Sequence, residues 1–363
     1  MRLDIAERLT AGATGDRDTI GRWVILGGAL TLFFAVVLSL SVGPTGITLA
    51  SLPRVLVALL TGSDDQSVFR EHTVLLNLRI PRTLLGAFVG AALAVAGAMM
   101  QGMFRNPLAD PGLIGVSSGA ALAAVATIAL GNGLASPWIK VFGVYALPFA
   151  AFSGGLVATL VLVTVAGRHG QLMIGTLLLA GIAVAAFAEA MTGLISYASD
   201  DRELRDLTLW RMGSLSGASW VKVIAIAPFA IVILAALPRL TRALNGFLLG
   251  EAEAFHLGID VEATKRLVVA VTAAAVGAAV AVAGIVGFVG IVIPHLVRLI
   301  AGPDHRFVLP AGALLGAALV LVADVVARMV VRPAELPLGI VMAAIGAPVF
   351  LHLVLRRGIG GLE

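Results

Sequence analysis

Long apolar runs recur along the whole chain, and they constrain its fold more than any other feature of the sequence. The first run, residues 23–42, holds no charged residue and has the roughly 20 residues that a helix needs to cross about 30 Å of hydrocarbon. Only 13% of the chain is charged and 59% is hydrophobic, against about 25% charged in an ordinary soluble domain. The sequence therefore predicts an all-α integral membrane protein.

Ten such charge-poor runs divide the chain into about ten transmembrane helices. They cover residues 23–42, 83–104, 112–130, 141–167, 171–197, 219–238, 267–283, 285–300, 307–327 and 336–355. The first run follows several arginines, as a cleaved signal peptide would, but it is longer than the 7–15 apolar residues of a signal. We expect an N-terminal segment (1–22), one membrane domain (23–357) and a short tail (358–363).

The seventh and eighth runs are separated only by glycines. No Asp, Glu, Lys or Arg lies between Arg266 and Arg298, and one helix over this stretch would be far longer than a bilayer is thick. We therefore expect a tight reversal at Gly284, Gly287 and Gly290, with a short helix on each side. Small residues four apart, such as Gly86 with Gly90 and Gly312 with Gly316, predict close helix packing elsewhere.

Basic residues set the expected orientation. An even number of crossings puts both termini on one side, and that side carries the larger share of the 25 Lys and Arg residues. By the positive-inside rule it is the cytoplasm. The longest loop on this side, about 239–266, lies between the sixth and seventh runs.

The residue inventory excludes several kinds of chemistry. With no cysteine there is no disulfide or thiolate metal site, and none of the three lysines follows a glycine, as a phosphate-binding Walker loop requires. His295 has no partner at metal-ligand spacing, so a buried structural imidazole is favoured over a ligand to haem iron. We expect no enzyme activity, no bound cofactor or metal and no nucleic-acid partner.

Five motifs carry a resemblance to a known family. They are LRIPRTL from Leu78, QGMFRNPLADPGLIGVSSGA from Gln101, GFLLGEAEAFHLGI from Gly246, GIVGFVGIVIPHLVRLIAGPDHR from Gly284 and ELPLGIVMAAIGAPVF from Glu335. Together they closely resemble the FecCD-type permeases of ABC importers, which carry ferric siderophores, haem or cobalamin. The resemblance implies a multi-pass protein of the bacterial inner membrane, a homodimer or pseudo-dimer, two cytoplasmic ATPase subunits and a periplasmic substrate-binding protein.

In the family, the long cytoplasmic loop resembles the coupling helices that dock on the ATPase. This loop mixes apolar and acidic residues and reads as two short helices broken at two glycines. The expected coupling residues are Leu249, Gly250, Glu251, Ala254, Leu257 and Gly258. The alternative is a solvated amphipathic loop without a partner.

Three arginines are expected at the periplasmic face. Arg79 and Arg82 precede the second helix and Arg328 ends the ninth. The resemblance implies that they form a pocket for a glutamate on a lobe of the binding protein, because a guanidinium grips a carboxylate bidentately. Three like charges would otherwise repel one another. Anchoring to lipid phosphates is the alternative.

Glu189 stands near the middle of the fifth apolar run. An ionisable group inside a membrane is costly, so it is a candidate for the transport pathway. A buried, protonated and hydrogen-bonded side chain with a purely structural role is the other interpretation.

The substrate is the least constrained prediction. The segment from Ser199 to Trp220 resembles the haem and siderophore permeases more than the cobalamin ones, which favours haem slightly over a ferric siderophore. A cobalamin permease is an alternative. An ion-coupled secondary transporter is an alternative of another class, but it would be expected to carry coupling carboxylates in several spans.

Overall fold

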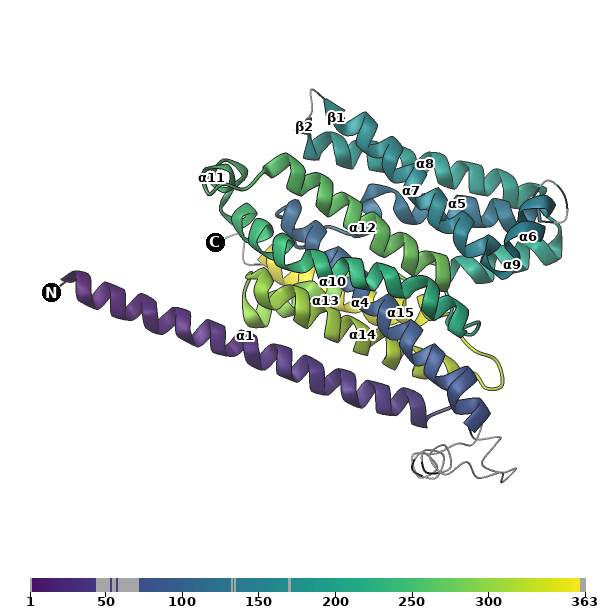
Figure 1. Cartoon of the computed structure of the whole chain (residues 1–363), viewed down its shortest axis with the longest axis horizontal. Helices are drawn as coiled ribbons and strands as arrows, with labels where there is room; N and C mark the ends of the chain where they lie inside the picture. Colours follow the sequence, from purple (N-terminus) through teal and green to yellow (C-terminus); the bar gives the residue numbers. More distant parts are fainter. Residues whose placement is uncertain are drawn as a thin grey trace.

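The protein is built almost entirely from helices (Figure 1). The computed structural model describes residues 2–43, 53, 57, 72–131, 133, 135–168 and 171–359. In chain order the elements are α1 (Arg2–Ser41), η1 (Leu75–Arg79), α4 (Ile80–Met103), η2 (Pro111–Ile114), α5 (Val116–Ala129), α6 (Ser136–Phe142), η3 (Gly143–Tyr145), α7 (Ala146–Ala166), β1 (Gly167–Arg168), β2 (Gln171–Leu172), α8 (Ile174–Ala198), α9 (Asp201–Arg211), α10 (Trp220–Leu249), α11 (Glu251–His256), α12 (Val261–Ala283), α13 (Val289–Ala301), α14 (His305–Met329) and α15 (Leu338–Ile359). Of the predicted tail, residues 360–363 lie outside the described part of the chain.

Each of the ten predicted apolar segments falls on a helix. Seven helical stretches of the described chain are long and apolar enough to cross a membrane: α1 from Arg17, η1 with α4, α6 with α7, α8, α10, α12 and α14. Three shorter apolar helices, α5, α13 and α15 up to His352, account for the remaining segments. The all-helical membrane architecture expected from the sequence is therefore confirmed.

The helix α4 lies at the centre of the bundle and contacts α10, α12, α13 and α14. A Cβ added at Gly90 would lie 2.2 Å from the carbonyl oxygen of Gly316, and one at Gly97 would lie 1.9 Å from that of Gly290. Both distances are far shorter than van der Waals contact, so only glycine lets these helices approach so closely. The predicted packing role is confirmed for Gly90 and Gly316 but not for Gly312, where an added Cβ would meet nothing within 4 Å.

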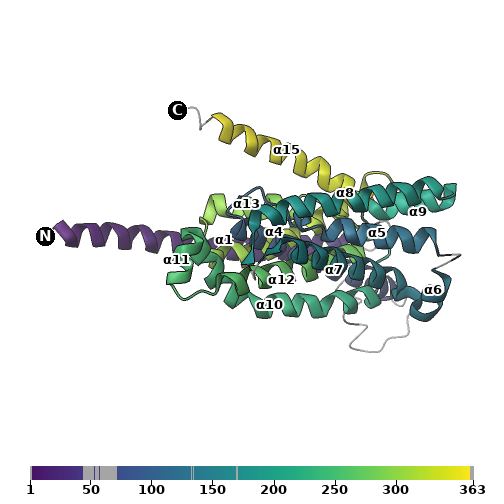
Figure 2. The ribbon, with the colours of Figure 1, turned by 90° about the horizontal axis from the view of Figure 1, so that it is seen from above.

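The helices at the periphery bury little of their apolar surface. In the most apolar stretch of α4 and of α12, 78% of residues are buried, whereas the share is 17% in α1 and in α10 and 22% in α8. The last turns of α15 diverge from the bundle (Figure 2), and Leu351 and Leu355 there are exposed. Such apolar side chains need lipid or another protein chain around them.

The reversal between α12 and α13 differs from the expectation at one glycine. The turn spans residues 284–288, and Gly284 has a φ of 72° that disfavours other residues. Gly290 lies inside α13, where it packs on α4. Only α13 is short, with 13 residues against 23 in α12.

The two ends of the bundle carry different polar elements (Figure 1). The short helix α11, the start of α1 and the end of α15 lie at one end. The polar helix α9 lies at the other end; it was absent from the ten predicted segments and begins with a capping box between Asp200 and Glu203. Both described chain ends thus share the end of the bundle that carries α11.

Candidate functional site

The segment between α10 and α12 is a protruding hairpin of helices. Gly250, with a φ of 130°, ends α10, and Gly258, with a φ of 78°, directly follows the C-cap residue of the single short helix α11. The two predicted breaks are therefore found at these glycines. The number of short helices is corrected to one, because α10 continues as a helix through residue 249 and includes the part expected to form the first of them.

The helix α11 and the residues that flank it have an anchored side and an exposed apolar side. Ala254 is fully buried against the rest of the protein, whereas Leu249, Phe255 and Leu257 are 65%, 68% and 56% exposed. Exposed large apolar side chains gathered at a polar end of a protein are typical of an interaction surface. We call the set Leu249, Phe255 and Leu257 the apolar tip.

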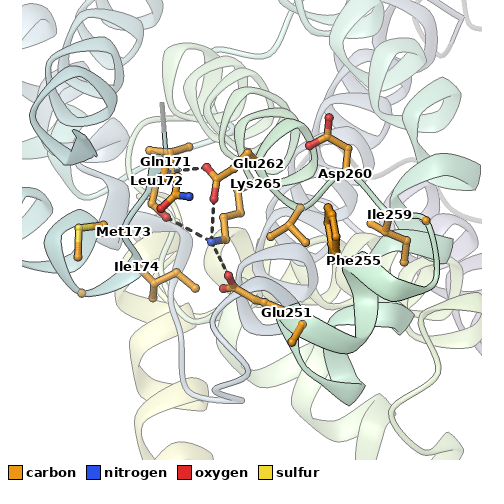
Figure 3. Close-up of a pocket in the computed structure, with 14 residues that line it drawn as sticks. Gln171, Leu172, Met173, Ile174, Glu251, Phe255, Ile259, Asp260, Glu262 and Lys265 are labelled. Carbon is orange, nitrogen blue, oxygen red and sulfur yellow. Dashed lines mark hydrogen bonds and ion pairs between the residues drawn. The ribbon is translucent and has the colours of Figure 1, made fainter. Parts of the chain in front are cut away.

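A buried lysine connects α11 to the body of the bundle (Figure 3). Lys265 of α12 is 6% exposed in its side chain, and its ammonium lies 2.7 Å from the carboxylate of Glu251 and 3.3 Å from that of Glu262. It also donates to the backbone carbonyl of Leu172, just before α8, at 3.3 Å. The Glu262 carboxylate accepts from the backbone N–H of Leu172 at 2.6 Å. One ammonium thus links α11, α12 and β2, the segment that leads into α8.

These residues border an open cavity of about 980 Å³ beside α11. Figure 3 shows Lys265 reaching the carboxylates between Met173 and Ile174 on one side and Phe255 and Ile259 on the other.

The three predicted docking arginines do gather at the end of the bundle away from α11, but they already have partners. Arg82 of α4 donates to both oxygens of Asp324 at 2.9–3.1 Å and to both oxygens of Glu335 at 2.9 Å. Arg328 lies 3.2 Å from Asp324 and donates to the carbonyl of Ser39 at 3.1 Å. The expectation that like charges here would stand unbalanced is corrected, because this chain supplies two carboxylates.

Burial distinguishes Arg82 from the other two arginines. Arg79 and Arg328 are each 4% exposed, and Arg79 donates to the backbone carbonyl of Leu40. Arg82 is 13% exposed in its side chain and lies beside Glu335, which is 29% exposed. Arg82 and Glu335 are therefore the members of the cluster that a visiting group reaches first.

Glu189 of α8 is not buried within this chain, as one of the two interpretations of the sequence expected. Its side chain is 51% exposed on this chain and accepts from the guanidinium of Arg211 in α9 at 2.8 and 3.0 Å. The pair joins the interior of α8 to the last residue of α9. His295, the other single polar residue of interest, is buried in α13.

Sequence reasoning missed Asp324, Glu335 and Glu262. A usable signal existed for Asp324, because an Asp four residues before Arg328 in an otherwise apolar helix is the spacing of an intrahelical ion pair. Glu262 likewise lies three residues before its partner Lys265 in one helix, whereas nothing local marks Glu335 as a partner of Arg82.

Comparison with known proteins identifies the family to which a chain with this arrangement belongs. Residues 31–356 match the FecCD transport family. The chain belongs to this family. The hemin transport system permease HmuU of Yersinia pestis is 45% identical over 283 residues, which cover 78% of this chain and 83% of HmuU. The vitamin B12 import permease BtuC of Escherichia coli is 39% identical over 353 residues, or 96% of this chain and 99% of BtuC.

Two further comparisons add another permease sequence and a solved structure. The cobalamin import permease BtuC of Halobacterium salinarum is 46% identical over 79% of this chain and 74% of its own length. A solved structure assigned to the metal-chelate type of ABC transporter, in an inward-facing conformation, matches with a TM-score of 0.77 at 31% identity and covers 92% of this chain and 99% of that one. This FecCD member is a multi-pass permease subunit of an ABC importer.

Proposed function

We propose that this FecCD permease imports a metal-centred macrocycle, with haem as the first candidate. The relative HmuU is named for hemin, and two BtuC relatives for cobalamin, which makes cobalamin the second candidate. Both are large ring systems around a metal. A ferric siderophore, the other substrate expected from the sequence, is a further candidate.

The exposed apolar tip is the observation that best supports import driven by a separate ATPase. A separate ATPase subunit would dock on the exposed Leu249, Phe255 and Leu257, and Glu251 would relay its movement through Lys265 to α8. The lysines of this chain offer no phosphate-binding loop of their own. The functional unit would be a homodimer with two ATPases, and its second copy would cover part of the weakly buried α8 and α15.

The topology that goes with this function has ten crossings and both termini in the cytoplasm. It is supported by the ten apolar helices and by the start of α1 and the end of α15 at the α11 end. The exposed Arg239, Arg242 and Arg306 lie at that same end. Residues 23–357 would form the membrane domain of a protein of the bacterial inner membrane, preceded by a cytoplasmic segment over residues 1–22.

The arginine cluster would receive the binding protein by exchange of carboxylates. Arg82 now grips Glu335 with Nη1 and Nη2, which is the contact that a glutamate on a lobe of the binding protein would make. Because Glu335 is partly exposed, a visiting carboxylate can replace it without opening the buried pair with Asp324. Arg79 and Arg328, which are buried, would support the pocket from the interior of the bundle.

Charge reversal tests the docking surface. Arg82→Glu should abolish capture of the binding protein, whereas Arg202→Glu, an exposed arginine of α9 outside the cluster, should leave capture intact. Capture by the unchanged chain should weaken as salt rises, since exposed charges are screened beyond about 10 Å at 0.1 M. Equal capture by both variants would show that the surface lies elsewhere.

Uptake measurements test the substrate. Proteoliposomes that contain the permease, its ATPase and its binding protein should accumulate haem, and unlabelled haem should compete better than cobalamin or a ferric siderophore. Uptake of cobalamin with no effect of haem would replace the first candidate by the second.

A further inference from the structure

A groove of about 600 Å³ opens between the last turns of α10 and the first turns of α14, at the α11 end of the bundle. The apolar tip and the arginine cluster do not contribute to it. Its polar lining is Thr241, Arg242, Asn245 and Arg306, and its apolar lining includes Leu237 and Pro310. The groove is therefore amphipathic, and nothing in the transport mechanism above uses it.

The two kinds of lining are separated by depth in the membrane. The helix α10 runs toward the α11 end and α14 runs away from it (Figure 1), so the polar residues of both helices lie near the α11 end of the bundle. Leu237 lies one turn before Thr241 on α10, and Pro310 lies one turn after Arg306 on α14. Both apolar residues thus face the groove one turn closer to the centre of the bundle. The lining changes from cationic to apolar along the direction in which a lipid changes from headgroup to acyl chain.

The two guanidinium groups differ in how they are held. Arg242 is exposed and has no carboxylate within 4.0 Å among the described residues. Arg306 is fixed by Asp304 at 2.7 Å and by Asp18 of α1 at 3.1 Å. These bonds use its Nε and Nη2 and leave its Nη1 to donate to a ligand, and the side chain is 57% exposed.

The carboxylate that positions Arg306 is ionised under ordinary conditions. Burial acts to raise the pKa of Asp304, but the backbone N–H of Arg306, the amide of Asn245 and the Arg306 guanidinium together bring this pKa below its ordinary value. Arg306 is thus held in one orientation at the edge of the groove.

We propose that this groove binds an anionic phospholipid, with its phosphate between Arg242 and Arg306. The Thr241 hydroxyl would donate to a phosphate oxygen, and an acyl chain would lie along Leu237 and Pro310. Basic pockets between transmembrane helices are known recognition sites for anionic headgroups. A lipid is favoured over free phosphate because the apolar half of the groove can pack against an acyl chain, whereas an inorganic ion would make no contact with it. Trp23 of α1, 66% exposed, is placed as an interfacial tryptophan near the same end.

The test is lipid titration of the purified full chain followed by native mass spectrometry. After delipidation, phosphatidylglycerol should bind and phosphatidylcholine should bind much less. Because one arginine near a membrane surface contributes about 1 kcal/mol, Arg242→Gln and Arg306→Gln should each weaken phosphatidylglycerol binding about fivefold. Arg239→Gln is the matched control, since Arg239 is an exposed arginine of the same helix outside the groove lining.

Three outcomes would overturn the proposal. Equal losses in all three variants would mean a general attraction to positive charge and no built site. Equal binding of phosphatidylcholine would mean that the headgroup charge is not recognised. Protection against thermal unfolding by inorganic phosphate that depends on Arg242, without further protection by phosphatidylglycerol, would assign the groove to a free anion. None of these readouts requires the ATPase, the binding protein or transport, so they are independent of the proposed function.

Discussion

At the scale of single residues, Asp324 holds the arginine cluster together. Its side chain is 2% exposed and contacts both Arg82 and Arg328. Removing one member of a buried ion pair costs about 3–5 kcal/mol, whereas Glu335, 29% exposed, should contribute about 1 kcal/mol or less. Asp324→Asn should therefore lower the thermal unfolding temperature in detergent far more than Glu335→Gln. Equal shifts would contradict the assignment of Asp324 as the structural carboxylate.

Glu189 offers a second test at this scale, because its partner can be removed separately. Both side chains of the Glu189–Arg211 pair are more than one third exposed, so Glu189→Gln and Arg211→Gln should each change the free energy of unfolding by less than about 1 kcal/mol. If Glu189 lines the pathway, its variant alone should slow transport. If both variants transport substrate at the rate of the unchanged chain, the pair has a purely structural role.

The limits of sequence reasoning follow from how far each contact reaches along the chain. The breaks at Gly250 and Gly258 were predictable, because a positive φ is a local property that glycine tolerates. The ion pair of Arg82 with Asp324 joins residues 242 positions apart. No pattern within either helix specifies such a contact, so the gathering of arginines was foreseen but their neutralisation was not.

At the scale of elements, the apolar tip should carry the ATPase contact. Leu249→Asp and Leu257→Asp place a charge on an exposed surface, so the permease should fold normally but no longer co-purify with its ATPase. Tyr197→Asp is a suitable control, since Tyr197 is 91% exposed at the far end of α8. A complex that survives both tip variants would place the contact elsewhere.

The link from α11 to α8 makes a different prediction, because it concerns coupling and not docking. Lys265→Met keeps the length of the buried side chain but removes the charge that holds Glu251 and the Leu172 carbonyl. The ATPase should still bind and hydrolyse ATP, while the substrate transported per ATP falls. The less buried Lys222 of α10, changed to methionine, is the control. Unchanged coupling in Lys265→Met would mean that movement reaches α8 by another route.

At the scale of the whole molecule, the topology can be tested directly, because the chain contains no cysteine. Tyr197→Cys on α8 and Phe255→Cys on α11 introduce single exposed thiols at opposite ends of the bundle. A membrane-impermeant maleimide should label the first in intact spheroplasts and the second only after lysis. The reverse pattern would invert the proposed orientation.

The central claim is that this permease moves its substrate with energy from a separate ATPase. The most direct measurement is haem uptake into proteoliposomes that contain the permease with its binding protein, with and without the ATPase subunit. Uptake should require both the ATPase and ATP, and should stop when the Walker lysine of the ATPase is replaced. Uptake driven by a proton or sodium gradient in vesicles without the ATPase would contradict the account and make the protein an ion-coupled transporter.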